Sequence, residues 1–342
     1  MYWLGIDAGA SSVKVVALDE EGRLVHAARR AHQGSLRACL RGMLDELAAA
    51  APSGAGLSPD DCAGVVATGS GAELLCACAP GLPVLQDVPA IASGVAHVAP
   101  RAASIIQMGA QSAVFIAASD AAAPVPFAAG VPRFAMNESC AAGTGSFFED
   151  QMERLGLPLE DYSRLVAEAR SVPRLSGRCS VFAKTDIIHR QQEGVPVEDI
   201  LQGLCHATVK TYKATIVRSL PVTRPVALVG GTLLNAGVLR AVREVFDLAE
   251  DELLCDEELL FAQAAGAALA VRAGTGTAPL RRVREGRASD DLPRLAPLPK
   301  VSCAPLRGYA LAATPWNPQG TPGCEGGPVP ASPAPAAPRS RA

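Results

Sequence analysis

The fold is indicated first by Leu4-Gly-Ile-Asp-Ala-Gly-Ala-Ser-Ser-Val-Lys-Val-Val-Ala-Leu-Asp19, which predicts two strands joined by a tight turn. Small residues at such a turn let backbone N–H groups and hydroxyls approach phosphates closely. Asp7 ends the first strand, where its carboxylate could orient magnesium-bound water, and Lys14 adds a positive charge. Taken alone, the segment slightly favours an ordinary hairpin with a solvated aspartate.

Two further turns of small residues follow buried strands. Gln107-Met-Gly-Ala-Gln-Ser112 lies between two expected strands, and Gly230-Gly231 ends a third strand before a helix that starts near Asn235. Three such turns could converge on one nucleotide, and the combination is much more specific than any single turn. The order of these elements resembles that of the acetate and sugar kinase, heat-shock chaperone and actin superfamily. The resemblance implies an α/β, actin-like (ribonuclease H-like), two-lobed ATPase fold.

The composition limits the classes of function. The chain has 342 residues, of which 49% are hydrophobic, and a net charge of −3. It is long enough for a large core, but it offers no positive surface for nucleic acid. No apolar run reaches the roughly 18–20 residues that span a bilayer, and Met1–Trp3 carries no basic leader. We therefore expect a cytoplasmic protein with no nucleic-acid or membrane partner.

The amino-acid composition changes along the chain and divides it into a body and a tail. We expect a two-lobed body over residues 1–272, with lobe I over about 1–136 and a mainly helical lobe II over about 137–272. Of the 27 prolines, 13 lie between Pro279 and Pro338, among Gly, Ser and Ala. Such a composition buries too little apolar surface to offset the entropy lost on ordering, so residues 273–342 are predicted to form a disordered tail.

Two of the ten cysteines have unusual neighbours, whereas most of the others stand in ordinary apolar settings. Cys140 lies in Met136-Asn-Glu-Ser-Cys-Ala-Ala-Gly-Thr-Gly-Ser-Phe-Phe-Glu149, and Cys179 lies in Arg178-Cys-Ser-Val-Phe-Ala-Lys184. Each precedes a predicted helix, whose unpaired N–H groups and partial positive charge stabilise thiolates and anionic clusters. Two structural cysteines without a metal, or a reactive thiol, remain alternatives.

The two cysteine blocks and the three turns together resemble a known family over about residues 3–272. That family comprises the activators (ATPase components) of 2-hydroxyacyl-CoA dehydratases and benzoyl-CoA reductases, the BadF/BadG/BcrA/BcrD type. The resemblance implies a homodimer in which each subunit gives two cysteines, here Cys140 and Cys179, to one [4Fe–4S] cluster. It also implies an ATPase that takes an electron from a ferredoxin or flavodoxin and passes it, at low potential, to a dehydratase or reductase.

The same resemblance implies a site for ATP, ADP and Mg²⁺, with Asp7 in a catalytic role. The residues that it assigns to nucleotide binding are Ala10, Ser11, Ser12, Val13, Lys14, Gly109, Ala110, Gln111, Thr144, Gly230, Gly231 and Asn235.

The chain departs from the family pattern at the nucleotide site. The second turn usually reads Asp-Ile-Gly-Gly-Gln-Asp in that family, but Gln107 and Ser112 replace both carboxylates and Ala110 replaces a glycine. An expected Glu-Ile-Thr-x-His segment is Asp87-Val-Pro-Ala-Ile91, and Leu260 stands where a polar contact is expected. We therefore expect nucleotide binding with slow or absent hydrolysis. Two alternatives stay open: a regulatory iron–sulfur subunit with little ATP hydrolysis, and a small-molecule kinase of the same superfamily.

Overall fold

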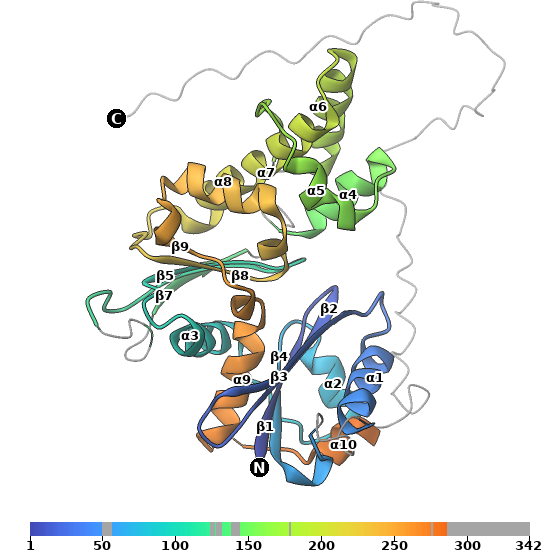
Figure 1. Cartoon of the computed structure of the whole chain (residues 1–342), viewed down its shortest axis with the longest axis vertical. Coiled ribbons are helices and arrows are strands. Elements are labelled where there is room, and N and C mark those ends of the chain that lie inside the picture. The colour runs from blue at the N-terminus through green and yellow to red at the C-terminus, as the bar shows by residue number, and fades with distance from the viewer. Residues whose placement is uncertain are drawn as a thin grey trace, which may run out of the picture. The chain divides into compact units, whose positions relative to one another are not determined.

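The computed structural model describes residues 1–49, 57–123, 127, 132–137, 144–177, 179–274 and 276–285. All of them belong to the first of two compact units, Met1–Leu292. In this part of the chain, nine strands form two sheets, with helices packed against each of them (Figure 1). No helix among these residues is both long enough and apolar enough to cross a membrane.

The first sheet contains the predicted strand–turn–strand segment. Its strand order is β3-β2-β1-β4, with β1 antiparallel to β2 and parallel to β4. Every residue of β2 is buried, as is nearly all of β1, so the apolar runs that predicted these strands form the centre of the sheet. The strands span Tyr2–Ala8 (β1), Ser12–Leu18 (β2), Leu24–Ala31 (β3) and Cys62–Thr68 (β4).

The second sheet brings together strands that are far apart in the sequence. Its order is β7-β6-β5-β8-β9, and β5 runs parallel to β8, so the turns that follow these two strands lie at the same sheet edge. The sheets thus divide between β4 and β5, earlier than the lobe boundary expected near residue 136, because β5–β7 pair with β8. The strands span Ser104–Met108 (β5), Ala113–Ala117 (β6), Arg133–Met136 (β7), Val226–Val229 (β8) and Leu253–Leu254 (β9).

The helices pack on these sheets through their apolar faces. In α1, the buried residues are Leu36, Leu40, Met43, Leu44 and Leu47, which are the ones whose spacing predicts an amphipathic helix. The helices span Leu36–Ala49 (α1), Ala72–Cys78 (α2), Asp87–Val98 (α3), Ser146–Leu155 (α4), Tyr162–Val166 (α5), Ser180–Gln192 (α6), Val197–Tyr212 (α7), Ala236–Phe246 (α8), Ala262–Arg272 (α9) and Leu280–Glu285 (α10).

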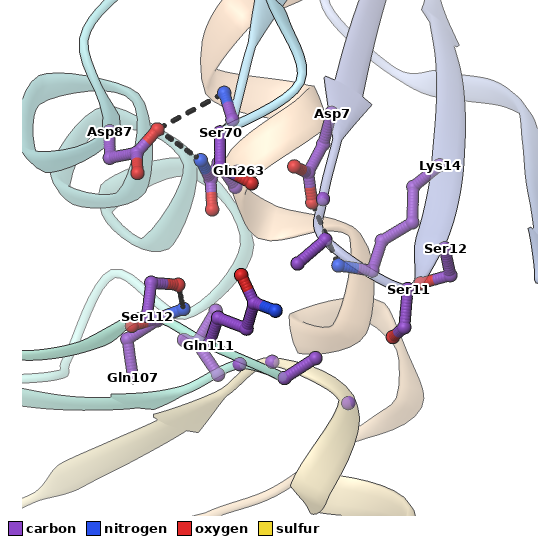
Figure 2. A pocket seen from close by; sticks show the side chains of 18 of the residues that line it. Asp7, Ser11, Ser12, Lys14, Ser70, Asp87, Gln107, Gln111, Ser112 and Gln263 are labelled. Atoms are coloured by element: carbon purple, nitrogen blue, oxygen red, sulfur yellow. Dashed lines mark hydrogen bonds and ion pairs between the residues drawn. The ribbon is translucent and has the colours of Figure 1, made fainter. Parts of the chain in front are cut away.

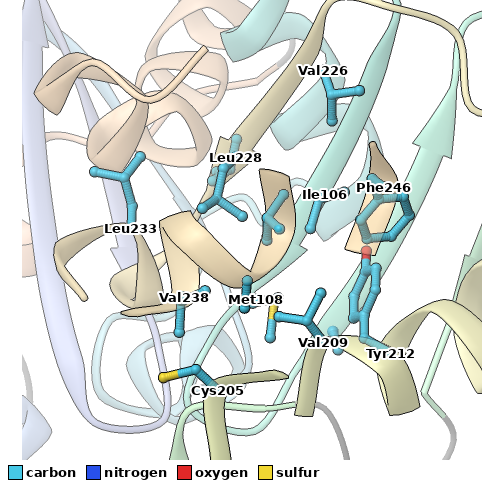
Figure 3. Packing of buried hydrophobic residues seen from close by; sticks show 14 of the residues in the cluster. Ile106, Met108, Cys205, Val209, Tyr212, Val226, Leu228, Leu233, Val238 and Phe246 are labelled. Atoms are coloured by element: carbon cyan, nitrogen blue, oxygen red, sulfur yellow. The ribbon is translucent and has the colours of Figure 1, made fainter. Parts of the chain in front are cut away.

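The core of the second sheet is built mainly from aliphatic side chains of β5, β8, α7 and α8 (Figure 3). Ile106, Val209 and Val226 are fully buried in it. The hydroxyl of the buried Tyr212 donates a hydrogen bond to the carbonyl oxygen of Val114 at 2.6 Å, so this polar group is satisfied inside the core. The helices α7 and α8 are thereby fixed on the strands that carry the second and third turns.

Helix α9 packs against α3 and β1 at backbone contact (Figure 1). A Cβ atom added at Gly94 would overlap the carbonyl oxygen of Ala262, and one added at Gly266 would overlap that of Ala90. Gly5 on β1 faces the carbonyl oxygen of Ala264 in the same way. These positions admit no side chain, so the small-residue run of α9 is required by its close packing.

The ordered body extends beyond the expected start of the tail at residue 273. Ala278 forms a bridge with Val65, and Leu280 at the start of α10 is 4% exposed in the core of the first sheet. Arg284 forms an ion pair with Asp45 of α1 at 3.3 Å. Burial of Ala278 and Leu280 in this core holds the segment that follows Gly276 against the first sheet. The rest of the predicted tail, residues 286–342, lies outside the described residues.

Substitution at the α3–α9 contact tests this packing. Gly94→Ala should lower the free energy of unfolding by about 1–3 kcal/mol, because the new methyl group meets a backbone carbonyl that cannot move aside alone. Gly42→Ala is the control: its Cβ would lie 3.4 Å from the flexible Arg30 side chain in the middle of α1, and it should stabilise by about 0.5–1 kcal/mol. Thermal unfolding of both variants measures the difference. If Gly94→Ala left the free energy of unfolding unchanged, the close contact between α3 and α9 would be contradicted.

Candidate functional site

The three predicted turns meet at one narrow cleft (Figure 2). The first comes from the end of β1, the second from the end of β5 and the third from the end of β8. The predicted site residues that line the cleft are Asp7, Ala10, Ser11, Ser12, Lys14, Gly109, Ala110, Gln111, Gly230 and Gly231.

The second and third turns are tied together through the backbone. The Gly109 N–H donates to the Ser112 carbonyl oxygen at 2.8 Å and closes the second turn. The Thr232 hydroxyl donates to the Met108 carbonyl oxygen at 3.0 Å, which joins the third turn to the end of β5. Gly230 has a φ of 104° and lies against the same carbonyl, a conformation that favours glycine. The local geometry therefore explains why a glycine stands at this position.

Three of the residues predicted for the nucleotide site do not line the narrow cleft. Val13 is fully buried in the core of the first sheet, because it faces inward on β2. Thr144 is fully buried, with its hydroxyl 3.2 Å from that of Ser146. Asn235 caps α8, where its side-chain oxygen accepts from the Gly237 and Val238 N–H groups, and it lines an adjoining cavity.

The adjoining cavity is wider than the cleft. Its volume is about 440 Å³, against about 60 Å³ for the narrow part, and Ser11, Arg29, Gly109, Ala110 and Gly231 line both. The wider part also has apolar and aromatic walls, including Phe148, Tyr162 and Leu234. A narrow polar end beside a broad, partly apolar end suits a ligand with an anionic end and a ring system. The combined volume lies within the range of about 300–1,000 Å³ that is typical of small-molecule sites.

A buried ion pair lies at the narrow end. The Lys14 ammonium is 2.7 Å from the Asp7 carboxylate, and both residues are less than 10% exposed. Arg29, which is opposite Lys14 in the pairing of β2 with β3, supplies a second cation to both cavities. Arg29 could not be predicted from the sequence, because nothing in the pattern of β3 shows which of its charged residues faces the cleft. Two cations from neighbouring strands favour an anionic ligand.

Asp87 is a second carboxylate in the cleft that sequence analysis treated only as a departure. Its Oδ1 accepts from the Gly69 N–H at 3.0 Å and from the Gln263 side-chain amide at 2.9 Å. Burial, together with the nearby Asp7 carboxylate, raises the pKa of Asp87. The sequence did contain an indication of this carboxylate, because Asp87 stands where the expected Glu-Ile-Thr-x-His segment has its glutamate. Ser70 and Gln263 also line the cleft and were likewise overlooked.

The second turn presents neutral groups to the cleft. Gln107 is 4% exposed and donates through Nε2 to the Ser112 hydroxyl at 3.0 Å (Figure 2). Its Oε1 has no hydrogen-bond partner among the described residues, although a buried amide oxygen normally has one. Leu260 lines the cleft as well, and Gln263, three residues later, supplies a polar group from the same side. The carboxylates of the cleft are therefore Asp7 and Asp87 alone within the described lining.

Cys179 occupies the N-cap position of α6, with extended backbone angles (φ −134°, ψ 128°), and no side chain caps this helix start. It is half-buried and lines a cavity of about 370 Å³ together with Phe182, Lys210 and Thr211. Cys140 lies outside the described residues. Among those that are described, no group of three or more His, Cys, Asp or Glu side chains could hold a metal ion. Cys179 thus lies directly before a helix, as the sequence predicts, and its sharing of a cluster with Cys140 stays a prediction.

Comparison with known proteins identifies the family. The model of the BadF/BadG/BcrA/BcrD ATPase family matches residues 4–270. The chain belongs to this ATPase family. It is 31% identical over 245 residues to the activator of lactoyl-CoA dehydratase from Anaerotignum propionicum, an alignment that covers 72% of this chain and 88% of that protein. The resemblance inferred from the turns and the cysteine blocks is confirmed.

Solved structures of similar proteins confirm the actin-like ATPase fold of this family member. Component A of the (R)-2-hydroxyglutaryl-CoA dehydratase from Acidaminococcus fermentans has a TM-score of 0.68 at 24% identity, with 79% of this chain and 96% of that chain covered. The activator of 2-hydroxyisocaproyl-CoA dehydratase from Clostridium difficile, solved with ADPNP, has a TM-score of 0.66 at 24% identity, with 80% and 95% covered.

Because the pKa of Asp87 is raised, ionisation of this carboxyl group should lower the stability of the folded protein as the pH rises. A carboxyl group whose pKa is raised on folding favours the folded state most below its ordinary pKa of about 4, and this contribution is lost as the pH rises through the folded-state pKa. Asp87→Asn should therefore raise the melting temperature at pH 7 by about 2–4 °C and flatten its decline between pH 4 and pH 7. Asp251→Asn, at an exposed carboxylate, is the control. An unchanged pH profile would contradict the assignment.

Proposed function

We propose that this chain is an ATP-dependent activator that delivers a low-potential electron to a partner 2-hydroxyacyl-CoA dehydratase or a related reductase. The observation that carries the proposal is the convergence of three phosphate-type turns on one cleft, in a member of an ATPase family. The similar proteins are named as activators of dehydratases. We further propose a cytoplasmic homodimer of two-lobed subunits that is reduced by a ferredoxin or flavodoxin.

The narrow cleft would hold the phosphates of ATP or ADP. Backbone N–H groups of the small-residue turns can approach phosphate oxygens closely, and Lys14 and Arg29 supply positive charge. The wider cavity, with its aromatic wall, would hold the nucleoside. Mg²⁺ prefers one or two carboxylates together with phosphate oxygens and water, so Asp7 fits a Mg–nucleotide complex. Bound Mg²⁺ would neutralise charge on the phosphates.

Hydrolysis would use the two carboxylates in different roles. Asp7, held by Lys14, would orient metal-bound water, whereas Asp87, with its raised pKa, would accept a proton from the attacking water. The water oxygen forms a bond to the γ-phosphorus while the bond to the β–γ bridging oxygen breaks. The products are ADP and inorganic phosphate, and Asp87 later releases the proton to solvent. Lys14 and Arg29 would stabilise the negative charge on the transferred phosphoryl group.

Cys140 and Cys179 would hold a [4Fe–4S] cluster, which when bound would supply one-electron transfer at low potential. Cys179 stands at the start of α6, where the N–H groups of the first turn and the positive end of the helix dipole lie, and Lys210 lines the same cavity. Because a cubane takes four thiolates and each chain offers two, two chains would be needed. Val181 and Phe182, 64% and 66% exposed just after Cys179, support a second chain packing there.

One observation favours a second candidate function. The hydrogen-bonded pair Gln107–Ser112 gives the second turn no negative charge, as a regulatory subunit that binds ATP without hydrolysing it would require. Phosphate release by the purified protein, stimulated by its dehydratase partner, would exclude this alternative. Nucleotide binding without phosphate release, with or without the partner, would favour it.

Removal of the cysteines tests the metal centre. Cys179→Ala and Cys140→Ala should each reduce the iron of anaerobically reconstituted protein from about four atoms per dimer to less than one, because two of four thiolates are lost from the dimer. ADP affinity should stay within about threefold, since Cys179 does not line the nucleotide cleft. Cys39→Ala, a half-exposed cysteine of α1, is the control and should keep its iron. Colourless wild-type protein after reconstitution would exclude the centre.

Restoring the carboxylates of the second turn tests the chemistry of the cleft. The double variant Gln107→Asp, Ser112→Asp should release phosphate at least about tenfold faster with Mg²⁺, because the added negative charge holds the metal at the phosphates. Gln107→Met, which is neutral and of similar size, is the control and should not accelerate release. The rate is measured as inorganic phosphate formed by metal-depleted and Mg²⁺-loaded protein. Equal rates in the wild type and the double variant would show that hydrolysis needs no carboxylates in the cleft other than Asp7 and Asp87.

A further inference from the structure

Gln107 is a buried side chain of the cleft whose carboxamide is only half satisfied. It lies on β5 between Ile106 and Met108, which belong to the core drawn in Figure 3. Successive side chains of a strand point to opposite faces, so Gln107 leaves that core and lines the narrow cleft. It is 4% exposed, and its Oε1 has no hydrogen-bond partner among the described residues. Because a buried amide oxygen without a partner is costly, this atom indicates the place of a donor that arrives with the ligand.

The other end of the same carboxamide is held in place. Its Nε2 donates to the Ser112 hydroxyl at 3.0 Å, across the second turn (Figure 2). Gly109 makes room for this bond, because a Cβ atom there would lie 2.8 Å from Ser112 Oγ and 2.9 Å from Gln107 Nε2. Rotation of the amide would break the bond to Ser112, so the position of Oε1 is fixed as well.

Water is the donor that suits Oε1. The Gln263 amide already uses its two N–H groups on Asp87, at 2.9 Å, and on the Thr68 hydroxyl, at 3.3 Å. The Lys14 ammonium donates to Asp7 at 2.7 Å. An ionised phosphate oxygen only accepts hydrogen bonds and would repel an amide oxygen. A water molecule beside a bound phosphate can instead donate to Oε1 and still offer a lone pair to the phosphorus.

Asp87 supplies a second acceptor from another wall of the same cleft. It stands at the start of α3, whereas Gln107 comes from β5, so one water in the cleft would meet an acceptor for each of its hydrogens. The two acceptors differ in what they can do with a proton. An amide oxygen holds a water without taking its proton, whereas a carboxylate whose pKa is raised can take it.

We propose that Gln107 is a catalytic residue that orients the attacking water of ATP hydrolysis by accepting a hydrogen bond from it at Oε1. The inference rests on the proposed function, because it takes the cleft as a site that hydrolyses ATP. The hydrogen that bonds to Gln107 stays on the water oxygen, whereas the other proton passes to Asp87. The oxygen lone pair forms the new bond to the γ-phosphorus, and the bond to the β–γ bridging oxygen breaks, which gives ADP and inorganic phosphate.

Single-turnover phosphate release by the full-length protein tests this role. Gln107→Met removes Oε1 at similar side-chain volume and should slow release from bound Mg–ATP by about tenfold or more, because the water loses its alignment. Its ADP affinity and the Mg²⁺ concentration that gives half the maximal rate should each stay within about threefold, since no bond to the nucleotide or the metal is lost. Gln107→Glu keeps an acceptor oxygen and should retain the wild-type rate or exceed it.

Gln151→Met is the matched control. The Gln151 amide is also fully buried and without a partner among the described residues, but it belongs to α4 and does not line the cleft, so release should not change. A second measurement uses ADP with aluminium fluoride, which imitates the transferred phosphoryl group with its attacking water. Its affinity should fall by about tenfold in Gln107→Met and stay unchanged in Gln151→Met.

Equal release rates in the wild type and Gln107→Met, or a Gln107→Glu as slow as Gln107→Met, would overturn the inference. Recovery of the full rate by Gln107→Met at higher Mg²⁺ would also overturn it, because Oε1 would then bind the metal. Wild type that binds ATP but neither releases phosphate nor binds ADP more tightly with aluminium fluoride would overturn the proposed hydrolysis itself. Should Gln107→Met not fold, Ser112→Ala decides: it frees the amide to rotate and should slow release by at least about threefold.

Discussion

The close packing of α9 against α3 and β1 is the constraint on which the cleft depends. Glycines at 5, 94 and 266 let three backbones meet where no side chain fits. This contact brings Gln263 within 2.9 Å of Asp87, at the start of α3, and packs α9 on the strand that carries Asp7 as well. Asp87 is therefore placed by helix packing, whereas Asp7 and the glycine turns are placed by the strand ends. A side chain at any of these glycines would disturb both kinds of group together.

The distribution of charge in the cleft follows from this arrangement. Asp7 is paired with Lys14, and Asp87 is held by an N–H group and an amide, so neither carboxylate is an isolated buried charge. Gln107 differs, because its buried amide oxygen lacks a partner among the described residues while it lines the cleft. An amide oxygen accepts from a donor or coordinates a cation, so water or Mg²⁺ suits this position and a bare phosphate oxygen does not.

The sequence was sufficient to predict the parts of the fold that arise from local pattern. Alternating and continuous apolar runs predicted β1 and β2, helical spacing predicted α1, and small residues after strands predicted turns that the structure brings to one cleft. The contributions of Arg29 and Asp87 were not predicted, because their approach is set by strand pairing and by the α3–α9 contact. Burial of Leu280 was not predicted either, because the Pro-rich composition around it is typical of a disordered tail; its burial extends the body to α10.

The replacement of carboxylates in the second turn and the contacts of that turn with Asn137 and the start of α4 concern different atoms. Substitutions at 107, 110 and 112 change side chains, whereas the bonds to Gly145, Ser146 and Asn137 use the backbone carbonyls and N–H of the turn. Exchange of Asp for Gln or Ser there alters how strongly the cleft holds metal, but it leaves those bonds intact. Side chains in this turn can therefore change how the cleft treats its ligand without changing how the turn is held to β7 and α4.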